Sequence, residues 1–574
     1  MSSYYIYDGL IKILLKKMKI LRLTIIILIS FRFIQGQVEN VPQQNAVYTF
    51  LKEMKVKNLI QYISEDVPNL SRFEVKSLLD SIRQSYSILS ETEKKLLYKY
   101  EIEFSDNLDE ETTSRLFTPG KPFTSTFLET FSNKIKYLFA YQEENANVYF
   151  EGLGHYYHGQ RFKPGVNNAE QYDIGFRIRG TVFNHLGYHF SVIKGGASGN
   201  KELAEIIQPK IKSSYKWIEN AENIGNYEFS EAYLKYHTEI FKGMHLGIQL
   251  GREPITIGYG YGSKLVLSGD TPTLDFFQFN FDYGIVHFTS IHASTVGTFS
   301  LDLNERYTKY FAFNRLKFSL PNLFEIGIGE SMIYSGRGIE LAYLTPIGFY
   351  KFIEMSIQDR DNGSLYFDIQ TNFIPDLELQ GTFFLDENIL SNLGDFERYT
   401  NKTAYQVGAF WYEAFGVDDL SWVVEYTRIR PYVYTHINPQ DNYTAWGLNL
   451  GHRIGPNSDE LFTRIAYNWN EWVRISMEYR HQRNGENVYD DQGNLIKNVG
   501  GDIFISHVSN PVNTSAPFLD GIRVNKDVIE AGVRIEPFRD LIFDIIYNYS
   551  IETNITNDYQ TYFNYGLIRF TLEY

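Results

Sequence analysis

The stretch YDIGFRIRGTVFNHLGYHFSVI, residues 172–193, decides the fold. Its first half places Tyr172, Ile174, Phe176 and Ile178 on one face and Asp173, Arg177 and Arg179 on the other. Successive side chains of a β-strand point to opposite faces, so this alternation predicts a strand with one apolar and one polar side. The residues NHLG (184–187) favour a tight turn, after which the chain returns as a second strand. The stretch is therefore expected to be a β-hairpin.

The same alternation ends the chain, in IRFTLEY at residues 568–574. Chain ends usually fray unless another element holds them. A chain that stops inside a strand, on Tyr574, indicates that its last strand has a partner and closes a sheet. We expect that partner to be the first strand of a barrel, because a closed sheet leaves no unpaired edge.

Short and long connections alternate between these strands. Tight turns are expected near residues 184–187, 242–243, 282–284, 320–322, 375–377, 415–419, 469–471 and 537–540. Longer irregular segments are expected at about 159–170, 194–226, 252–275, 297–308, 336–362, 386–404, 436–460, 484–525 and 551–560. Eight turns and nine loops separate about 18 strands, and short periplasmic turns with long extracellular loops are typical of outer-membrane barrels. The expected fold class is all-β, a transmembrane antiparallel β-barrel with a small N-terminal periplasmic helical region.

Composition agrees with a barrel in the bacterial outer membrane. The chain has 44 Tyr and 43 Phe, no Cys, and no later apolar run of membrane-helix length. The stretch MKILRLTIIILISFRFIQG (18–36) has the basic start and apolar centre of a secretory signal peptide, and Met18 is an alternative start. We expect residues 1–36 to be this signal. Without them the chain carries 48 Lys and Arg against 68 Asp and Glu, a net charge of −20, which argues against nucleic acid as a partner.

Residues 37–134 are expected to form a periplasmic helical region and linker, followed by the barrel at 135–574. The stretches SRFE (71–74) and SETE (90–93) are capping boxes, in which a hydroxyl and a carboxylate three residues apart begin a helix. Apolar residues follow each box at helical spacing. No chemistry is visible in this region, which is too small for a large core and is therefore expected to dock on the barrel.

Several loop stretches resemble the capsule assembly Wzi family. They are GREPITIGYGYGSKLVLSGDTPTLD (251–275), SGRGIELAYLTPIGFYKF (335–352), DRDNGSLYFD (359–368), LELQGTFFLDE (377–387) and YTHINPQDNYTAWGLNLGHRIGPNSDE (434–460). The resemblance covers nearly the whole mature chain, and VPQQNAVYTFLKEM (41–54) resembles the helical region of Bacteroidetes-type members. It implies an 18-stranded outer-membrane barrel that attaches or organises capsular or exopolysaccharide at the surface of a Gram-negative cell, with no catalytic residues and no cofactor. Expected partners are this polysaccharide, outer-membrane lipid and the barrel assembly machinery.

The family-like stretches fall on the long-loop side, where binding residues concentrate. Candidate polysaccharide-binding residues are Arg252, Tyr259, Tyr261, Lys264, Asp359, Asn362, His436 and Asn457. Tyrosine rings suit the apolar faces of sugar rings, cations suit carboxylates, and the remaining side chains suit hydroxyl groups. The alternative for the two tyrosines is a place in the membrane-interface aromatic belt.

Other motifs admit plainer interpretations. The stretch GYGYG (258–262) lacks the GK[ST] ending of a phosphate loop, and its glycines are expected to allow a tight bend with close backbone approach. The histidines of HYYH (155–158) face opposite ways on a strand, which argues against a shared metal. The carboxylates of DRDN and GPNSDE suit a divalent-cation site, hydrogen bonds to saccharide hydroxyls, or an ion-pair network in the lumen with Arg252, Arg315 and Arg337 that braces the barrel interior, and we favour the network. A diffusive porin is the main alternative function, ahead of a barrel-embedded hydrolase, because barrel form alone does not fix function.

Overall fold

The computed structural model describes most of residues 36–574. The described residues are 36–105, 107–118, 120–219, 224–270, 272–300, 302–358, 360–371, 373–386, 394–395, 397–509 and 515–574. The expected signal peptide lies almost wholly outside them, as does the candidate Asp359.

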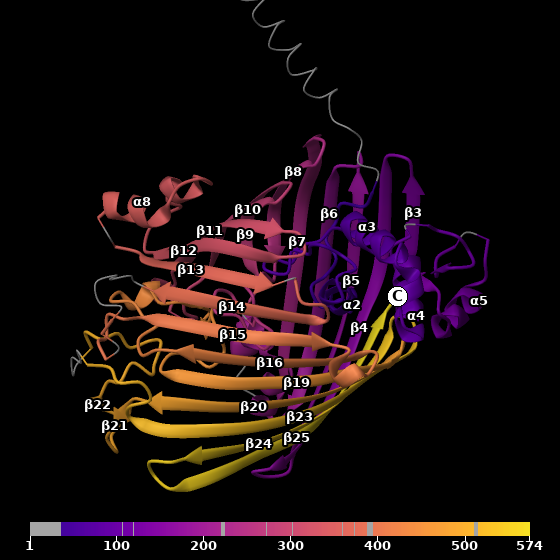
Figure 1. Ribbon diagram of the computed structural model, residues 1–574. Helices are drawn as coiled ribbons and strands as arrows, with labels where there is room; N and C mark the ends of the chain where they lie inside the picture. The colour runs from indigo at the N-terminus through magenta and orange to yellow at the C-terminus, as the bar shows by residue number, and fades with distance from the viewer. Residues whose placement is uncertain are drawn as a thin grey trace, which may run out of the picture.

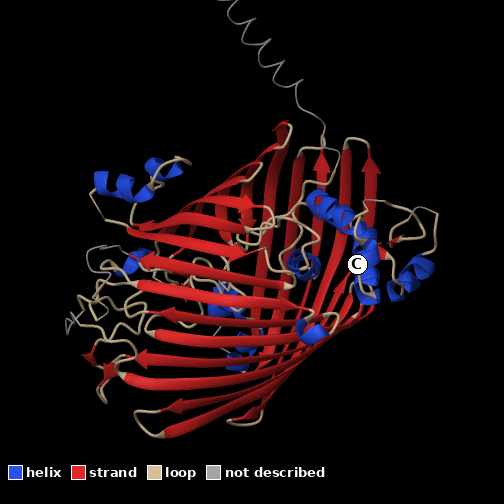
Figure 2. Cartoon of the chain, viewed as in Figure 1, coloured by secondary structure: helices blue, strands red, loops and turns tan. Residues whose placement is uncertain are grey.

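In the described residues, eighteen antiparallel strands form a closed barrel (Figures 1 and 2). They are β4 (Ala146–Lys163), β5 (Asn167–Val182), β6 (Leu186–Gly199), β7 (Ile224–Phe241), β8 (Met244–Glu253), β9 (Leu274–Tyr283), β10 (Val286–Val296), β11 (Thr308–Leu320), β12 (Phe324–Ser335), β13 (Asn362–Thr371), β14 (Leu377–Asp386), β15 (Thr403–Tyr412), β16 (Leu420–Ile429), β19 (Ser458–Asn470), β20 (Val473–Glu486), β23 (Ile522–Phe538), β24 (Leu541–Asn554) and β25 (Tyr559–Glu573). The expected strand number is confirmed. In addition, β3 (Phe139–Glu143) pairs with the beginning of β4.

The last strand closes the barrel, as its alternation predicted. Strand β25 pairs with β4 in antiparallel register, with Leu572 opposite Gly154. Beyond it, the N–H of Tyr574 donates to the carbonyl of Gly152 at 2.8 Å. The Tyr574 hydroxyl donates to the carbonyl of Thr126 at 3.0 Å. Pairing therefore continues to the final residue, and no free strand edge remains at the closure.

Alternation along the strands separates the two sides of the wall. On β5, Tyr172 and Ile174 are 62% and 73% exposed and face outward, whereas Arg179 is buried in the interior against Glu39 and Glu151. Apolar side chains on the outer side and polar ones inside are the pattern of a barrel wall in lipid. No helix among the described residues is long and apolar enough to cross a membrane.

Short turns lie at one end of the barrel and longer loops lie at the other. Two of the expected long loops are in fact short. Residues 159–170 lie largely in β4 and β5, which are joined by residues 164–166, and residues 551–560 lie largely in β24 and β25. Both pairs of strands extend farther than expected because their backbones remain paired where the apolar alternation weakens.

The N-terminal region contains α2 (Val47–Val56), α3 (Arg72–Arg83) and α4 (Glu91–Glu103), and both expected capping boxes are present. The shorter elements of the chain are η1 (Tyr86–Ile88), β1 (Thr113–Arg115), α5 (Phe123–Leu128), η2 (Glu129–Phe131), β2 (Ile135–Tyr137), α6 (Lys201–Ile207), η3 (Pro209–Ser213), α7 (Tyr215–Glu219), η4 (Leu303–Glu305), η5 (Leu341–Leu344), α8 (Tyr350–Ser356), η7 (Ala414–Gly416), η8 (Pro439–Asp441), β17 (Thr444–Ala445), β18 (Leu448–Asn449), β21 (Val488–Tyr489) and β22 (Leu495–Lys497). The helices α2 to α4 lie at the short-turn end, opposite α8 (Figure 1).

Candidate functional site

Residues 37–104, here called the N-terminal plug, lie across the short-turn end of the barrel. Their apolar core includes Phe410, Tyr412, Val423 and Phe462, which are inward-facing residues of β15, β16 and β19. On the opposite wall, the N–H of Val38 donates to the hydroxyl of Thr181 on β5 at 2.7 Å. Contacts with strands on opposite sides of the ring show that the plug fills this end.

Buried ion pairs hold the plug to the wall. The Lys55 ammonium lies 2.8 Å from the Glu325 carboxylate, and both side chains are about 1% exposed. Burial lowers the pKa of Lys55, but Glu325, Glu65 and Glu378 outweigh burial and raise it, so this lysine stays charged. Asp66 pairs with both Arg315 and Lys317 of β11.

A loop from the opposite end reaches the plug inside the barrel. This inserted loop, residues 254–273, follows β8, and its two branches pair where Ile257 meets Leu267. The N–H of Gly258 donates to the carbonyl of Asp66 at 2.8 Å, and the Lys264 ammonium donates to the carbonyl of Glu65 at 3.0 Å. Two segments that enter from opposite ends therefore meet in the lumen.

Glycine at position 260 permits the bend at the loop's tip. Its φ of +156° lies where side chains are strained, and a Cβ there would lie 2.2 Å from the carbonyl oxygen of Ser263. The GYGYG stretch is therefore a tight bend, in agreement with the structural interpretation of its glycines.

Residues 430–457 form a second inward loop that covers the first. The hydroxyl of Tyr434 donates to the carbonyl of Leu265 at 2.7 Å, and that of Tyr443 to the carbonyl of Val266 at 2.8 Å. Both loops and the inward side chains of β9 to β16 share one apolar core. A hydrophobic core thus replaces the polar lumen on this side of the barrel.

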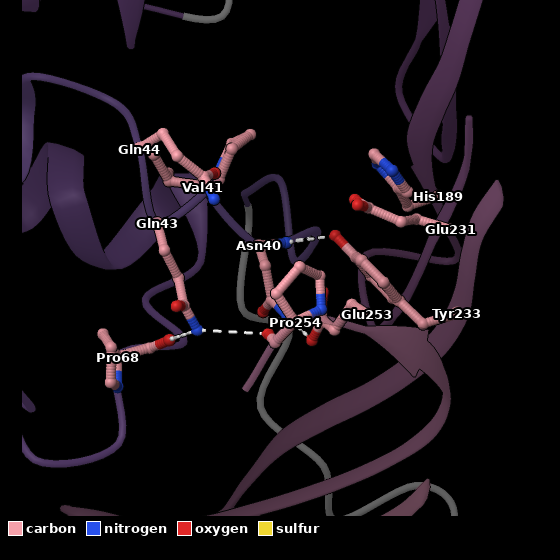
Figure 3. A pocket seen from close by; sticks show the side chains of 11 residues that line it. Asn40, Val41, Gln43, Gln44, Pro68, His189, Glu231, Tyr233, Glu253 and Pro254 are labelled. Carbon is pink, nitrogen blue, oxygen red and sulfur yellow. Dashed lines mark hydrogen bonds between the residues drawn. The ribbon is translucent and has the colours of Figure 1, made fainter. Parts of the chain in front are cut away.

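A small space remains where the plug meets the wall. Its volume is about 40 Å³, and it lies between residues 40–44 and the inner side of β6 to β8 (Figure 3). The Gln43 amide donates to the carbonyls of Pro68 and Pro254 at 3.2 and 3.4 Å, which ties the plug to the start of the inserted loop. A space of this size suits about one water molecule and is too small for a sugar residue.

The structure separates the predicted site residues instead of gathering them. Tyr259 is 3% exposed and donates to Glu325 at 3.0 Å, and Tyr261 donates to Glu378 at 2.7 Å. Burial lowers the pKa of Lys264 to about 8. In this structure these three side chains link the inserted loop to the wall and plug, and Tyr259 presents no ring face for sugar stacking.

The remaining predicted residues have varied surroundings. Asn362 is 1% exposed and donates to the carbonyl of Asp441 at 2.9 Å. Asn457, fully buried, donates to Gly485 at 2.8 Å and accepts from the N–H of Leu519 at 2.7 Å. These two asparagines hold loops together. His436 lies half-buried on the second inward loop, and Arg252 pairs with Asp275 on the outer side of the wall at 3.0 Å.

The carboxylate-rich stretches form ion pairs. Asp361 of DRDN pairs with Arg337, and Asp459 and Glu460 of GPNSDE pair with Arg483 and Arg453. The three arginines do not form the expected single lumen network: Arg315 pairs with Asp368 in the interior at 2.7 Å, whereas Arg252 pairs with Asp275 on the outer side of the wall. His155 pairs with Asp173 and His158 lies near Glu170, on opposite faces of β4 as expected. Within the described ranges, no group of three or more His, Asp or Glu side chains is placed to hold a metal ion.

An aromatic group that the sequence did not reveal lies at the long-loop end. It consists of Tyr215, Phe299 and Trp446, here called the outer aromatic cluster, from three loops far apart in the chain. The Phe299 and Trp446 rings stack with centroids 6.4 Å apart, and Tyr215 meets Phe299 edge-on at 5.7 Å. Tyr215 is 42% exposed, and the Arg306 guanidinium lies 5.9 Å from its ring centroid. Partly exposed rings beside polar groups suit the mixed surface of a saccharide.

Backbone contacts fix this cluster. The N–H of Trp446 donates to the carbonyl of Val296 at 2.9 Å, and the N–H of Gly447 donates to Gly297 at 3.1 Å. The hairpin of β17 and β18 is thereby docked on the end of β10. Because the three rings come from separate loops, no local sequence pattern could have shown that they meet.

Comparisons with known proteins agree with this architecture. A family model described as capsule assembly protein Wzi matches residues 142–501. The chain is similar to the structure of Wzi, described as an Escherichia coli outer-membrane protein involved in group 1 capsule assembly and a carbohydrate-binding β-barrel. The two are 14% identical with a TM-score of 0.54, over 93% of this chain and 99% of that one, a likeness that shows the fold.

A weaker similarity links the chain to the outer membrane protein OprD of Pseudomonas aeruginosa. It has 11% identity and a TM-score of 0.40, over 74% of this chain and 94% of that one, and it carries no argument here. Comparison with curated proteins finds no match. The family model spans more than half of the sequence, and the closed barrel has the fold of the Wzi structure. The chain belongs to the capsule assembly protein Wzi family.

Proposed function

We propose that this protein attaches or organises capsular or exopolysaccharide at the surface of a Gram-negative cell, without catalysing a reaction. The observation that carries the proposal is the closed interior, in which the plug and the inserted loop meet at Asp66 and Gly258. A barrel filled in this way has its long outer loops as the available working surface. Family membership and the carbohydrate-binding description of the similar E. coli protein support the same function.

The long-loop end faces outward in this proposal, and the plug faces the periplasm. At that end, the outer aromatic cluster brings together the described parts of three loops, which join β6 to β7, β10 to β11 and β16 to β19. We assign the cluster the role of a platform for sugar rings, with Arg306 beside it for acidic groups. Of the residues proposed from sequence, Arg252 is exposed and His436 is half-buried, whereas the contacts of Tyr259, Tyr261 and Lys264 with the wall and plug favour a role in positioning the loops.

Binding of purified surface polysaccharide to the detergent-solubilised full chain tests this role. Tyr215→Ala with Trp446→Ala removes two of the three rings, and we expect affinity to fall roughly 5- to 100-fold, since each ring contributes about 0.5–1.5 kcal/mol. Tyr489→Ala is the matched control, because Tyr489 is also 42% exposed on an outer loop but lies outside the cluster. Equal affinity of all three proteins would remove the cluster from the proposal.

Conductance in a planar lipid bilayer separates this function from a diffusive porin. The plug and both inward loops obstruct the lumen, so the wild-type chain is expected to insert without open-channel current. Steady ion-conducting steps from the wild-type chain would favour the porin instead.

A further inference from the structure

One long connection takes a path outside the barrel. Residues 336–361, here called the outer-wall segment, join β12 to β13 and contain η5 and α8. Figure 1 shows α8 at the margin of the molecule, beyond β12 and β13 and opposite the N-terminal helices. The segment therefore differs from the two loops that enter the lumen.

Alternation on β11 and β12 shows which side of the wall the segment covers. Phe311, Phe313 and Ile333 belong to the interior core, so their neighbours Ala312 and Met332 point outward. The fully buried Tyr343 and Tyr350 of the segment pack against these two outward residues and against Tyr334. The segment is thus folded against the outer surface of the barrel.

The wall beneath the segment carries polar side chains where lipid-facing strands usually carry apolar ones. Four polar residues point outward there, and each is below 10% exposed: Ser290, His292, Asn314 and Glu330. Elsewhere on the same or neighbouring strands the outward residues are apolar and exposed, as in Phe318, Ile326, Phe367 and Ile369. The outward-facing polar residues therefore lie where the outer-wall segment covers the wall.

Hydrogen bonds from the segment reach two of these polar residues, Asn314 and Glu330, and His292 is hydrogen-bonded to Tyr334 of the wall at 2.8 Å. The amide of Asn314 donates to the carbonyl of Gly348 at 3.0 Å, and the hydroxyl of Tyr350 donates to Asn314 at 3.1 Å. The N–H of Tyr350 donates to the Glu330 carboxylate at 2.8 Å. Water would satisfy such groups without a cover, but hydrocarbon would leave each unpaired at a cost of several kcal/mol.

The other face of the segment is apolar and uncovered. Its exposed large apolar side chains are Ile339, Leu341, Leu344, Ile347, Phe349, Phe352 and Met355, which outnumber the exposed polar residues of its described part, Thr345, Ser356, Gln358 and Arg360. Ile347 and Phe352 are 89% and 75% exposed. Surfaces that face water rarely carry an apolar patch of this kind. On a barrel in lipid, the same patch extends the apolar belt that contacts acyl chains.

The contacts also give the depth of the segment. It reaches from Ser335, the last residue of β12, back to Glu330, which is five residues or roughly 16 Å along a strand. If the long-loop end faces outward, a span of this length is comparable with the outer half of the hydrocarbon core, which is about 30 Å thick in all. The outer-wall segment therefore has one face that seals polar groups and another that matches acyl chains.

We propose that the outer-wall segment is embedded in the outer leaflet, where the acyl chains of lipid cover its exposed apolar face. It would fix the depth and tilt of the barrel beside the loops that act on polysaccharide. The inference does not depend on polysaccharide binding, because it rests on the wall and the segment alone.

Site-directed spin labelling tests this inference. The full chain contains no cysteine, so single labels at Ile347→Cys and Phe352→Cys can be placed in the protein reconstituted in phosphatidylcholine vesicles. Collisions with oxygen report lipid, and collisions with a water-soluble nickel complex report water. Ile174→Cys, on the outward face of β5, is the lipid control, and Leu303→Cys, 72% exposed on the β10–β11 loop, is the water control. Heat-modifiable mobility confirms that each labelled barrel is folded.

Both segment labels are expected to favour oxygen over the nickel complex, as the Ile174 label does. A nickel-complex accessibility equal to that at Leu303 would overturn the inference. Protection from both reagents would overturn it as well, since that result means that protein, either a second copy or another partner, covers the face.

Discussion

At the scale of single residues, Asp66 joins three parts of the molecule. Its carboxylate pairs with Arg315 and Lys317 of the wall, and its carbonyl accepts from Gly258 of the inserted loop. Removal of one partner from a buried charge network is costly because the remaining charges stay buried without compensation.

We expect Asp66→Ala to weaken docking of the plug by about 3–5 kcal/mol. A protease added to the detergent-solubilised protein should then cleave within residues 37–104 roughly 100-fold faster or more, if opening precedes cleavage. Glu91→Ala is the control, because the Lys94–Glu91 pair lies on the surface with Glu91 84% exposed. Equal cleavage rates for the two variants would contradict the role of Asp66.

Acid is expected to loosen the plug through Glu65. Burial raises the pKa of this carboxyl, but Lys52 and Lys55 outweigh burial and lower the pKa to about 2. A carboxyl with a lowered folded pKa stabilises the docked state above its unfolded pKa of about 4.5, and this stabilisation is lost as the pH falls toward 2. Protease sensitivity of the plug should rise over this range, and Glu65→Gln should flatten the rise. A pH profile identical to that of the wild-type chain would exclude Glu65 as the group whose protonation loosens the plug.

Tyr259→Phe distinguishes positioning from sugar binding. The substitution leaves the buried Glu325 carboxylate without one donor, so we expect a loss of about 1–3 kcal/mol in stability, read as a lower temperature of heat modification. Polysaccharide affinity should not change. A loss of affinity at unchanged stability would return Tyr259 to the binding surface.

Tyr259 and Tyr261 show how much of the inserted loop can be predicted from the sequence. Tyr259 and Tyr261 were found because they interrupt a glycine-rich loop, and the expected bend was correct. Their burial depends on whether a loop turns into the barrel or away from it. The path of the loop depends on hydrogen bonds to residues far away in the sequence, such as Glu325 and Glu378. No local sequence pattern shows that these residues meet the loop.

At the scale of elements, strands were more predictable than loops. Alternation identifies a strand and its two faces within a few residues, so hairpins, most turns and the closing strand followed from sequence. The capping boxes likewise located α3 and α4. The paths of the loops could not be predicted in the same way. The inserted loop and the second inward loop enter the lumen, whereas the outer-wall segment lies on the outside of the barrel. These paths depend on contacts with residues far away in the sequence.

The inserted loop is expected to be the main obstruction of the lumen together with the plug. Replacement of residues 258–264 by a short Gly-Ser linker removes the contacts with Asp66, Glu325 and Glu378. Ion current through a bilayer, which is expected to be absent for the wild-type chain, should appear. Replacement of residues 491–494, in the exposed turn between β21 and β22, is the control and should leave the bilayer silent. No current from the first variant would show that the rest of the interior suffices to close the barrel.

At the scale of the whole molecule, the barrel resembles a filled cylinder with a working surface at one end. The 18 strands were predictable because each crossing of the wall leaves a turn or a loop in the sequence. The filled interior was not, since it is assembled from the plug, residues 37–104, and from loops near residues 260 and 440. The outer aromatic cluster escaped prediction for the same reason.

The most direct measurement of the central claim is the fraction of surface polysaccharide that remains attached to cells. In a deletion strain we expect the polymer to be made in normal amount but to be released into the medium. The wild-type chain should restore attachment, whereas Tyr215→Ala with Trp446→Ala should restore it only in part at equal barrel abundance. Unchanged attachment in the deletion strain would contradict a role in organising polysaccharide at the cell surface.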